Sequence, residues 1–191
     1  RRYCGFLRLH RIADNQVLVV NHVPVEDYLK GVLGAELPRS FQIETYKAQA
    51  ICARTFALYE KLSRDNGQRP FDVSATEASQ VYHGIEVHST KSLQAVEATR
   101  GIVLVGETAK GWKIFPAFFS STCGGVTQAG RYLAAIDPDF RPLQGGVTCS
   151  GCSLSPKYHW AEQRIPAAEV VERLRERGAG NLSGLRQVYV A

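Results

Sequence analysis

One glutamate, Glu36, stands at the break between two predicted helices and is the residue best placed to do acid–base chemistry. It has apolar neighbours on both sides, and Pro38 follows two positions later. A carboxyl group at such a junction is partly removed from water, which favours its protonated form and suits it to general acid and base catalysis. The alternative is structural, because an acid at a helix end could instead pair with Arg39 or Lys30.

Cysteines form the second group able to do chemistry, and they occur at positions 4, 52, 123, 149 and 152. Cys149 and Cys152 make a C-x-x-C pair in a Gly/Ser-rich stretch, a spacing typical of half a zinc site, and Cys123 could converge on it. A fourth ligand would have to be another cysteine or a histidine, of which His159 and His83 are the candidates.

The two helices around Glu36 are predicted from their end signals and their periodicity. Pro24 suits the start of the first helix, Gly34 and Pro38 bracket its end, and the second helix runs from about Gln42 to Leu62. A stripe at helical spacing predicts a buried face at Tyr46, Ala50, Ala53 and Ala57. On a neighbouring face, Lys47 and Arg54 lie roughly 10 Å apart and could bind substrate or lock buried carboxylates.

Other elements flank these helices. Alternating residues around the turn at Asp14 and Asn15 predict a hairpin over residues 3–23. Further along, we expect β-like pieces at 71–73 and 81–82, a helix at 89–99, a strand hairpin of 102–105 with 114–120, irregular loops over 126–157, a helix at 166–178 and a strand at 185–190. Together they predict a single α+β domain over residues 1–191, with two central helices packed on a mainly antiparallel β framework.

Composition narrows the function classes. The chain has 191 residues, 45% hydrophobic and 21% charged, and no apolar run approaches the roughly 18 residues that cross a bilayer. The net charge of +5 would favour acidic polymers such as nucleic acid or cell wall, and the alternative is a merely solvated surface. No dense basic block or aromatic–basic motif points to nucleic acid. The absence of Met and the start at Arg1 predict a processed chain whose leader or anchor has been removed.

Motifs along nearly the whole chain resemble the stage II sporulation protein D (SpoIID) family, which includes the LytB amidase-enhancer relatives. The principal ones are V-P-V-E-D-Y-L-K-G-V-L-G-A-E-L-P at 23–38 and K-A-Q-A-I-C-A-R-T-F-A-L at 47–58. The others are Asp72, S-Q-V-Y-x-G at 79–84, A-V-x-A-T-x-G at 95–101, F-F-S-S-T-x-G-G at 118–125 and S-P-x-Y-x-W at 155–160.

The resemblance implies an extracytoplasmic lytic transglycosylase that cleaves the bond between N-acetylmuramic acid and N-acetylglucosamine in peptidoglycan strands stripped of stem peptides. Glu36 matches the catalytic acid of the family's A-E-M-P motif, with Leu37 in place of Met. One carboxylate suffices, because the C6 hydroxyl of the muramic acid serves as an internal nucleophile and closes a 1,6-anhydro ring. The alternative is a non-catalytic glycan-binding enhancer of a cell-wall amidase.

The resemblance also implies a set of substrate-binding candidates: Lys47, Gln49, Arg54, Asp72, Gln80, Tyr82, Ser120, Ser121 and Thr122. For Arg54 we favour a supporting role over substrate contact. The hydroxyl groups of residues 120–122 could instead form hydrogen bonds with the backbone of their own turn. A serine nucleophile is disfavoured, because no His/Asp partner pattern accompanies these residues. Tyr82, Tyr158 and Trp160 could stack on sugars or simply belong to the core.

For the cysteines, the resemblance implies a structural zinc that orders loops, but the family's exact ligands do not carry over residue by residue. From the spacing in this sequence, the predicted ligands are Cys123, Cys149, Cys152 and His159. A disulfide is the alternative, because an oxidising extracytoplasmic compartment permits one, and free thiols are the third possibility. A zinc hydrolase is disfavoured, since cysteine-rich tetrahedral sites are usually closed and structural. Cys52, within the alanine-rich helix, is most simply a small buried residue.

Overall fold

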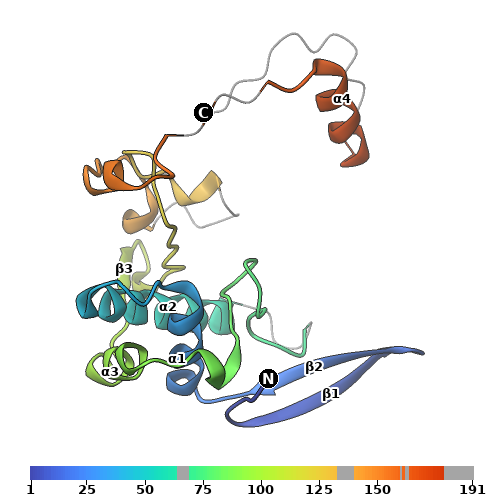
Figure 1. The fold of residues 1–191 in the computed structure, drawn as a ribbon, viewed down its shortest axis with the longest axis vertical. Coiled ribbons are helices and arrows are strands. Elements are labelled where there is room, and N and C mark those ends of the chain that lie inside the picture. The colour runs from blue at the N-terminus through green and yellow to red at the C-terminus, as the bar shows by residue number, and fades with distance from the viewer. Residues whose placement is uncertain (64–68, 133–139, 160, 162–163, 179–191) are drawn as a thin grey trace.

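The computed structural model describes residues 1–63, 69–132, 140–159, 161 and 164–178 and has the predicted α+β composition (Figure 1). Its strands and helices are β1 (Phe6–Ala13), β2 (Gln16–His22), α1 (Val25–Glu36), α2 (Ile43–Ser63), α3 (Thr90–Ala98), β3 (Val105–Thr108), β4 (Gly111–Ile114) and α4 (Ala167–Glu176). Short 3-10 turns lie at Gly84–Val87, Gly130–Tyr132, Arg141–Leu143 and Gly151–Leu154. The predicted strand at 185–190 and Trp160 lie outside the described residues.

The main core lies among α1, α2 and α3, which pack against one another. All four residues of the predicted stripe on α2 are buried there, so its assignment to the core is confirmed. They meet the fully buried Leu29, Val32 and Leu33 of α1 and Val96 of α3. α3 begins with a capping box between Ser89 and Ser92, which satisfies main-chain N–H groups at the start of this short helix.

Two glycines of α1 let the segment after residue 81 approach the helix closely. A Cβ atom at Gly31 would lie 2.6 Å from the ring of Tyr82, and one at Gly34 would collide with the carbonyl of Val87. A helix surface without side chains at these two positions therefore accepts the backbone of the 3-10 turn at Gly84–Val87. This contact brings residues 80–82 alongside the end of α1 that carries Glu36.

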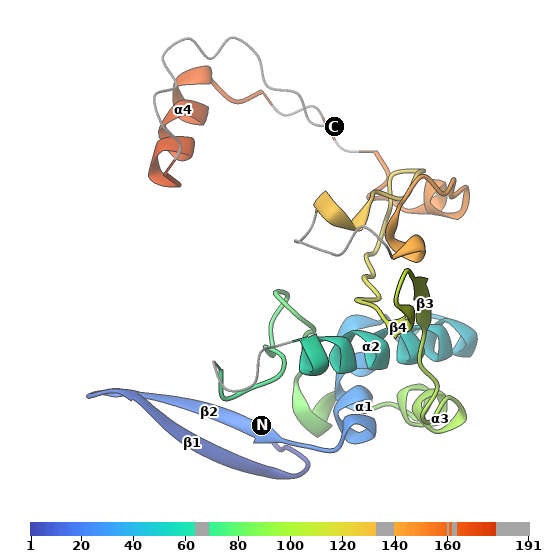
Figure 2. The same cartoon turned by 180° about the vertical axis from the view of Figure 1, so that it is seen from behind.

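The β framework consists of two separate antiparallel hairpins, β1–β2 and β3–β4, among the described residues. The β1–β2 turn falls at Asp14 and Asn15, as predicted. Both views show this hairpin extending away from the helices, so the three helices pack mainly on one another and not on a sheet (Figures 1 and 2).

The second hairpin is displaced from the predicted one. β3 and β4 pair from Val105 to Thr108 and from Gly111 to Ile114, so they lie mostly in the stretch predicted as the turn. They share only Val105 and Ile114 with the predicted strands at 102–105 and 114–120. Before the hairpin, the N–H of Leu104 bonds to Thr55 Oγ1 at 2.9 Å. After it, residues 115–117 enter a small second core against Phe140.

Neither β-like piece predicted at 71–73 and 81–82 forms a strand. Side chains near them take the main-chain donors that a sheet would use: Ser79 Oγ accepts from the N–H of Ser74, and Glu36 accepts from the N–H of Val81. Residues 126–157 are irregular where the structure describes them, as predicted. The predicted helix at 166–178 is confirmed as α4, which has no buried residue. None of the described helices has both the length and the apolar character needed to cross a bilayer.

Candidate functional site

Glu36 is the last residue of α1 and is half-buried. Its Oε1 accepts a hydrogen bond of 2.8 Å from the main-chain N–H of Val81. The ion pairs that would make it a structural acid are absent from the described residues, since Lys30 bonds Asp27 at 2.7 Å and Arg39 is exposed. The described hydrogen bonds also include none to Oε2 of Glu36. One oxygen of this carboxyl group is therefore held, and the other has no partner there.

The segment beside Glu36 is anchored on both sides of Val81. Gln80 is fully buried; its Oε1 accepts from the hydroxyl of Tyr28 at 3.0 Å, and its Nε2 donates to the carbonyl of Ala53 at 3.2 Å. Tyr82 is 6% exposed, and its hydroxyl donates to Asn21 Oδ1 at 3.1 Å. Gln80 thus links this segment to α1 and α2, while Tyr82 links it to the end of β2.

Both tyrosines of this network remain protonated donors at neutral pH. Burial raises the pKa of Tyr28 far above its ordinary value, and electrostatic interactions with the neighbouring Tyr82 and Glu36 raise it further. Burial, and then the neighbouring Cys4 and Tyr3, raise the pKa of Tyr82 to about 12. The hydroxyl of Tyr28 bonds Gln80, and the next residue, Val81, bonds Glu36, so the network and the carboxylate belong to one site.

Arg54 is 1% exposed and acts as a structural lock. Its Nε and Nη2 bond the two carboxylate oxygens of Glu26 at 3.0 and 2.7 Å, and its Nη1 donates to the carbonyl of Ile102 at 3.0 Å. Burial would raise the pKa of Glu26, but the hydrogen bonds and charge of Arg54 outweigh it and hold this pKa below its ordinary value. Of the two predicted interpretations, the structure favours the one in which Arg54 locks a carboxylate.

Three other predicted substrate-binding residues have no hydrogen-bond connection to Glu36 in the described structure. Lys47 bonds Glu44 at 2.8 Å, and the exposed Asp72 bonds Lys61 at 3.2 Å. Gln49 is half-buried, and its Nε2 has no hydrogen-bond partner within the described structure. No hydrogen bond of the described residues joins any of these side chains to Glu36, whereas Gln80 and Tyr82 flank the residue that does bond it.

The hydroxyl loop predicted at 120–122 is tied to a distant motif. Ser120 and Ser121 are exposed, while Thr122 Oγ1 and Ser155 Oγ lie 2.9 Å apart and share a hydrogen bond. This bond links the motif at 118–125 to the one at 155–160. Only Ser120 and Ser121 therefore keep hydroxyl groups open to solvent in this loop.

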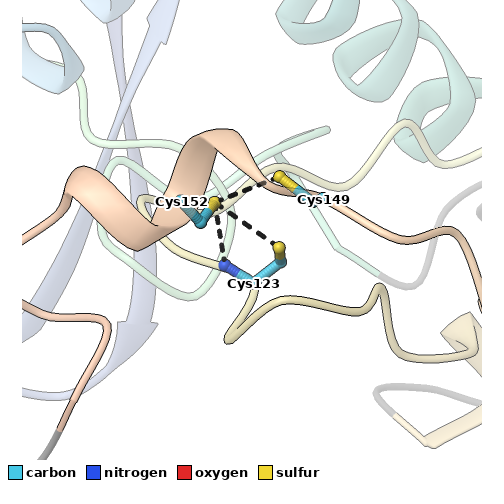
Figure 3. Close-up of side chains that lie close together, drawn as sticks. All are labelled: Cys123, Cys149 and Cys152. Atoms are coloured by element: carbon cyan, nitrogen blue, oxygen red, sulfur yellow. Dashed lines mark hydrogen bonds between the residues drawn. The ribbon is translucent and has the colours of Figure 1, made fainter.

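Three of the predicted metal ligands converge. Figure 3 shows the side chains of Cys123, Cys149 and Cys152 pointing toward one another, and their sulfurs all lie within 4.8 Å of each other. Cys152 Sγ is 3.4 Å from Cys123 Sγ and 3.5 Å from Cys149 Sγ. A zinc ion with bonds of about 2.3 Å to tetrahedral thiolates separates them by roughly 3.8 Å, so this donor set fits zinc. His159 is not part of the group that the described residues form.

The thiols are free, and their contacts alter their acidity. None of the five cysteines forms a disulfide. Hydrogen bonds from the backbone and thiol of Cys152 lower the pKa of Cys149. A hydrogen bond from the backbone of Cys123 would lower the pKa of Cys152, but the thiols of Cys123 and Cys149 outweigh it and raise that pKa. Binding of a metal would require these thiols to lose their protons.

A hollow of about 400 Å³ lies elsewhere on the surface. The end of α2, β4 and Phe140 surround it, and its lining residues are Tyr59, Leu62, Ser63, Lys113, Ile114 and Phe140. No predicted site residue lines it. Its size alone does not indicate a reaction, so the network around Glu36 remains the better candidate site.

Residues that sequence reasoning missed complete the site. Tyr28, Asn21 and the N–H of Val81 were not predicted to belong to this hydrogen-bond network, although Tyr28 lies within the motif at 23–38. Tyr28 lies on the same helix as Glu36, two turns away, and this spacing is the signal that could have found it. The N–H of Val81 carries no sequence signal, because every non-proline residue has one.

Comparisons with known proteins find one matching family and several relatives of this chain. Residues 13–105 match the family described as Stage II sporulation protein. The chain is 30% identical over 168 residues to the stage II sporulation protein D of Bacillus subtilis, an alignment covering 81% of the chain and 47% of that protein. It is 38% identical over 144 residues to an uncharacterized protein of Brachyspira hyodysenteriae, covering 75% of the chain and 37% of that protein.

A third relative carries a different name. Over 101 residues the chain is 36% identical to the amidase enhancer of Bacillus subtilis, covering 53% of the chain and 12% of that protein. The chain thus spans less than half the length of each of these relatives. The family match over residues 13–105 includes the segments that carry Glu36 and Gln80.

Proposed function

Because this chain belongs to the stage II sporulation protein D family, we propose that it is a lytic transglycosylase of peptidoglycan with Glu36 as its only catalytic acid and base. Its substrates are glycan strands, preferentially those without stem peptides. The proposed cleaving domain comprises residues 1–191 and acts outside the cytoplasm. The names of the relatives support a role connected with the cell wall.

The reaction needs one carboxyl group that first donates and then accepts a proton. Glu36 protonates the oxygen between N-acetylmuramic acid and N-acetylglucosamine, and the bond from that oxygen to C1 of the muramic acid breaks. The C6 hydroxyl oxygen of the same sugar then bonds to C1, and its proton passes to the Glu36 carboxylate. The products are a 1,6-anhydromuramic end and a free C4 hydroxyl on N-acetylglucosamine, with no water consumed.

The environment of Glu36 is the observation that carries this proposal. A half-buried carboxyl group with one oxygen held by the N–H of Val81, and with no ion pair among the described residues, can exchange a proton without breaking a salt bridge. A purely structural acid at this position would have its charge satisfied, as Glu26 does with Arg54. The contrast favours chemistry at Glu36.

The thiol cluster supports a second part of the proposal, a structural zinc. Cys123, Cys149 and Cys152 would hold it, and it would order the loops that carry Ser120 and Ser121. The metal takes no part in the reaction. His159 is not in the group that the described residues form, so His159, water or another residue would complete the fourth position.

A second candidate function is glycan binding that stimulates a cell-wall amidase. The similarity to a protein named amidase enhancer favours it. The same surface beside Glu36 would then bind glycan without cleaving it. Formation of product separates the two functions.

The test compares wild-type protein with Glu36→Gln on purified glycan strands, with and without stem peptides, and identifies products by mass spectrometry. We expect 1,6-anhydromuramic ends from wild type and a loss of about 10²- to 10⁴-fold in rate for the variant. Glu97→Gln is the matched control, because Glu97 is an exposed helix acid whose partner, Arg100, is not a predicted site residue. Reducing ends that incorporate oxygen from labelled water would show hydrolysis instead. Binding without any cleavage would show the enhancer function.

A further inference from the structure

We propose that Gln80 and Tyr28 are positioning residues for Glu36, acting through the main-chain N–H of Val81. This inference rests on the proposed function of Glu36 and assigns to Gln80 a role different from the predicted substrate contact. A fully buried amide cannot reach a glycan strand.

Gln80 is fixed at both ends of its amide. The hydroxyl of Tyr28 donates to its Oε1, and its Nε2 donates to the carbonyl of Ala53, so α1 and α2 each hold one atom. These bonds join residues 52 and 27 positions apart in sequence. A buried amide with both groups satisfied has one stable orientation, because any other leaves an unpaired polar group in the core.

The peptide unit between Gln80 and Val81 transmits this position to Glu36. The peptide is planar, so fixing the Cα atom and side chain of Gln80 restricts the direction of the next N–H. That N–H donates to Glu36 Oε1 at 2.8 Å, a distance typical of a charge-assisted bond. The neighbouring Tyr82 restrains the other side through its bond to Asn21.

The same bond distinguishes the two oxygens of Glu36. Oε1 accepts from an N–H, so in the acid form the proton resides on Oε2, which has no partner among the described hydrogen bonds. Oε2 is then the atom that faces the glycosidic oxygen. If the N–H of Val81 moved, the carboxyl group could rotate and direct its proton elsewhere, with little effect on how the glycan binds.

The experiment measures kcat and KM for release of 1,6-anhydro ends, together with hydrogen exchange at the Val81 amide. Gln80→Met keeps the length and burial of the side chain but removes the amide, and Tyr28→Phe removes only the hydroxyl. Thr55→Val is the matched control, because it removes a buried hydroxyl of α2 that accepts from Leu104 and not from this network. Exchange at other core amides shows whether each variant is folded.

For Gln80→Met and Tyr28→Phe we expect kcat to fall by about 10- to 100-fold and KM to stay within about twofold of wild type. We expect the Val81 amide hydrogen to exchange at least about tenfold faster in both variants. The control should leave all three unchanged. Equal losses in all three variants, or unchanged exchange at Val81, would overturn the proposal.

Failure of the proposed function gives a different pattern. If wild type releases no anhydro ends, the catalytic role of Glu36 is wrong. Hydrogen exchange at the Val81 amide then still tests whether Gln80 positions Val81. Faster exchange at Val81 in Gln80→Met and Glu36→Gln, but not in Thr55→Val, would retain that link. Unchanged exchange in Gln80→Met would overturn it.

Discussion

The region around Glu36 and the loops that carry the cysteines are ordered by different means. Around Glu36, three helices share a core with many fully buried side chains, and buried polar groups such as Gln80 and Arg54 are bonded to them. In the described part of 118–159, few residues are buried, and side-chain links such as Thr122 to Ser155 and the thiol cluster hold the loops.

This difference indicates where each region obtains its stability. Burial of apolar surface stabilises the helical core without any ligand. Loops with little buried surface need cross-links, hydrogen bonds or a metal to offset the entropy lost on ordering. Changes in the core should therefore alter the stability of the helical region, while changes at the cysteines should act locally.

The largest effect is expected from Arg54→Met. The substitution leaves the carboxylate of Glu26 without its partner and removes the donor to Ile102, so the free energy of unfolding should fall by about 3–5 kcal/mol. Chemical denaturation followed by circular dichroism measures it. Lys61→Met is the control, because the pair of Lys61 and Asp72 is exposed on both sides and should change stability by less than about 1 kcal/mol. Similar losses in both variants would contradict a special role for the buried pair.

A smaller effect is expected from acid. Arg54 holds the pKa of Glu26 below its ordinary value of 4.5 despite the opposing effect of burial, so the unfolded chain binds a proton more readily than the folded protein. The stabilisation from this pair is complete above pH 4.5 and is lost as pH falls through the lower pKa of the folded state. Stability measured from pH 6 down to about pH 3 should therefore fall more steeply in wild type than in Glu26→Gln. Parallel curves would show that other carboxyl groups govern the acid response.

The smallest effect on the core is expected from Cys152→Ser. It should remove binding of one zinc ion per chain, measured by titration of metal-free protein, and increase hydrogen exchange at the amides of Cys123 and Cys149. The unfolding transition of the helices should not change. Cys52→Ala should keep zinc binding, because Cys52 is not in the cluster. Zinc binding that survives Cys152→Ser would exclude the thiol site.

Local sequence signals predicted the helices well. Pro24 and Pro38 bracket α1, small residues at helical spacing placed one face of α2 in the core, and the helix predicted at 89–99 forms as α3. These signals work because helix ends and helix faces depend on residues at most a few turns apart. The pieces at 71–73 and 81–82 were wrongly predicted as strands, because their β-forming residues find side-chain acceptors and no partner strand.

The sequence by itself determined the candidate residues: Glu36 at a helix end, three cysteines with metal-ligand spacing, and motifs that identify the family. The tertiary structure alone decided which of them meet. The bond from Val81 to Glu36 spans 45 positions, and that from Tyr28 to Gln80 spans 52. Such contacts depend on how helices pack and on which polar groups are left to be satisfied in the core, and neither is encoded in the spacing of neighbouring residues.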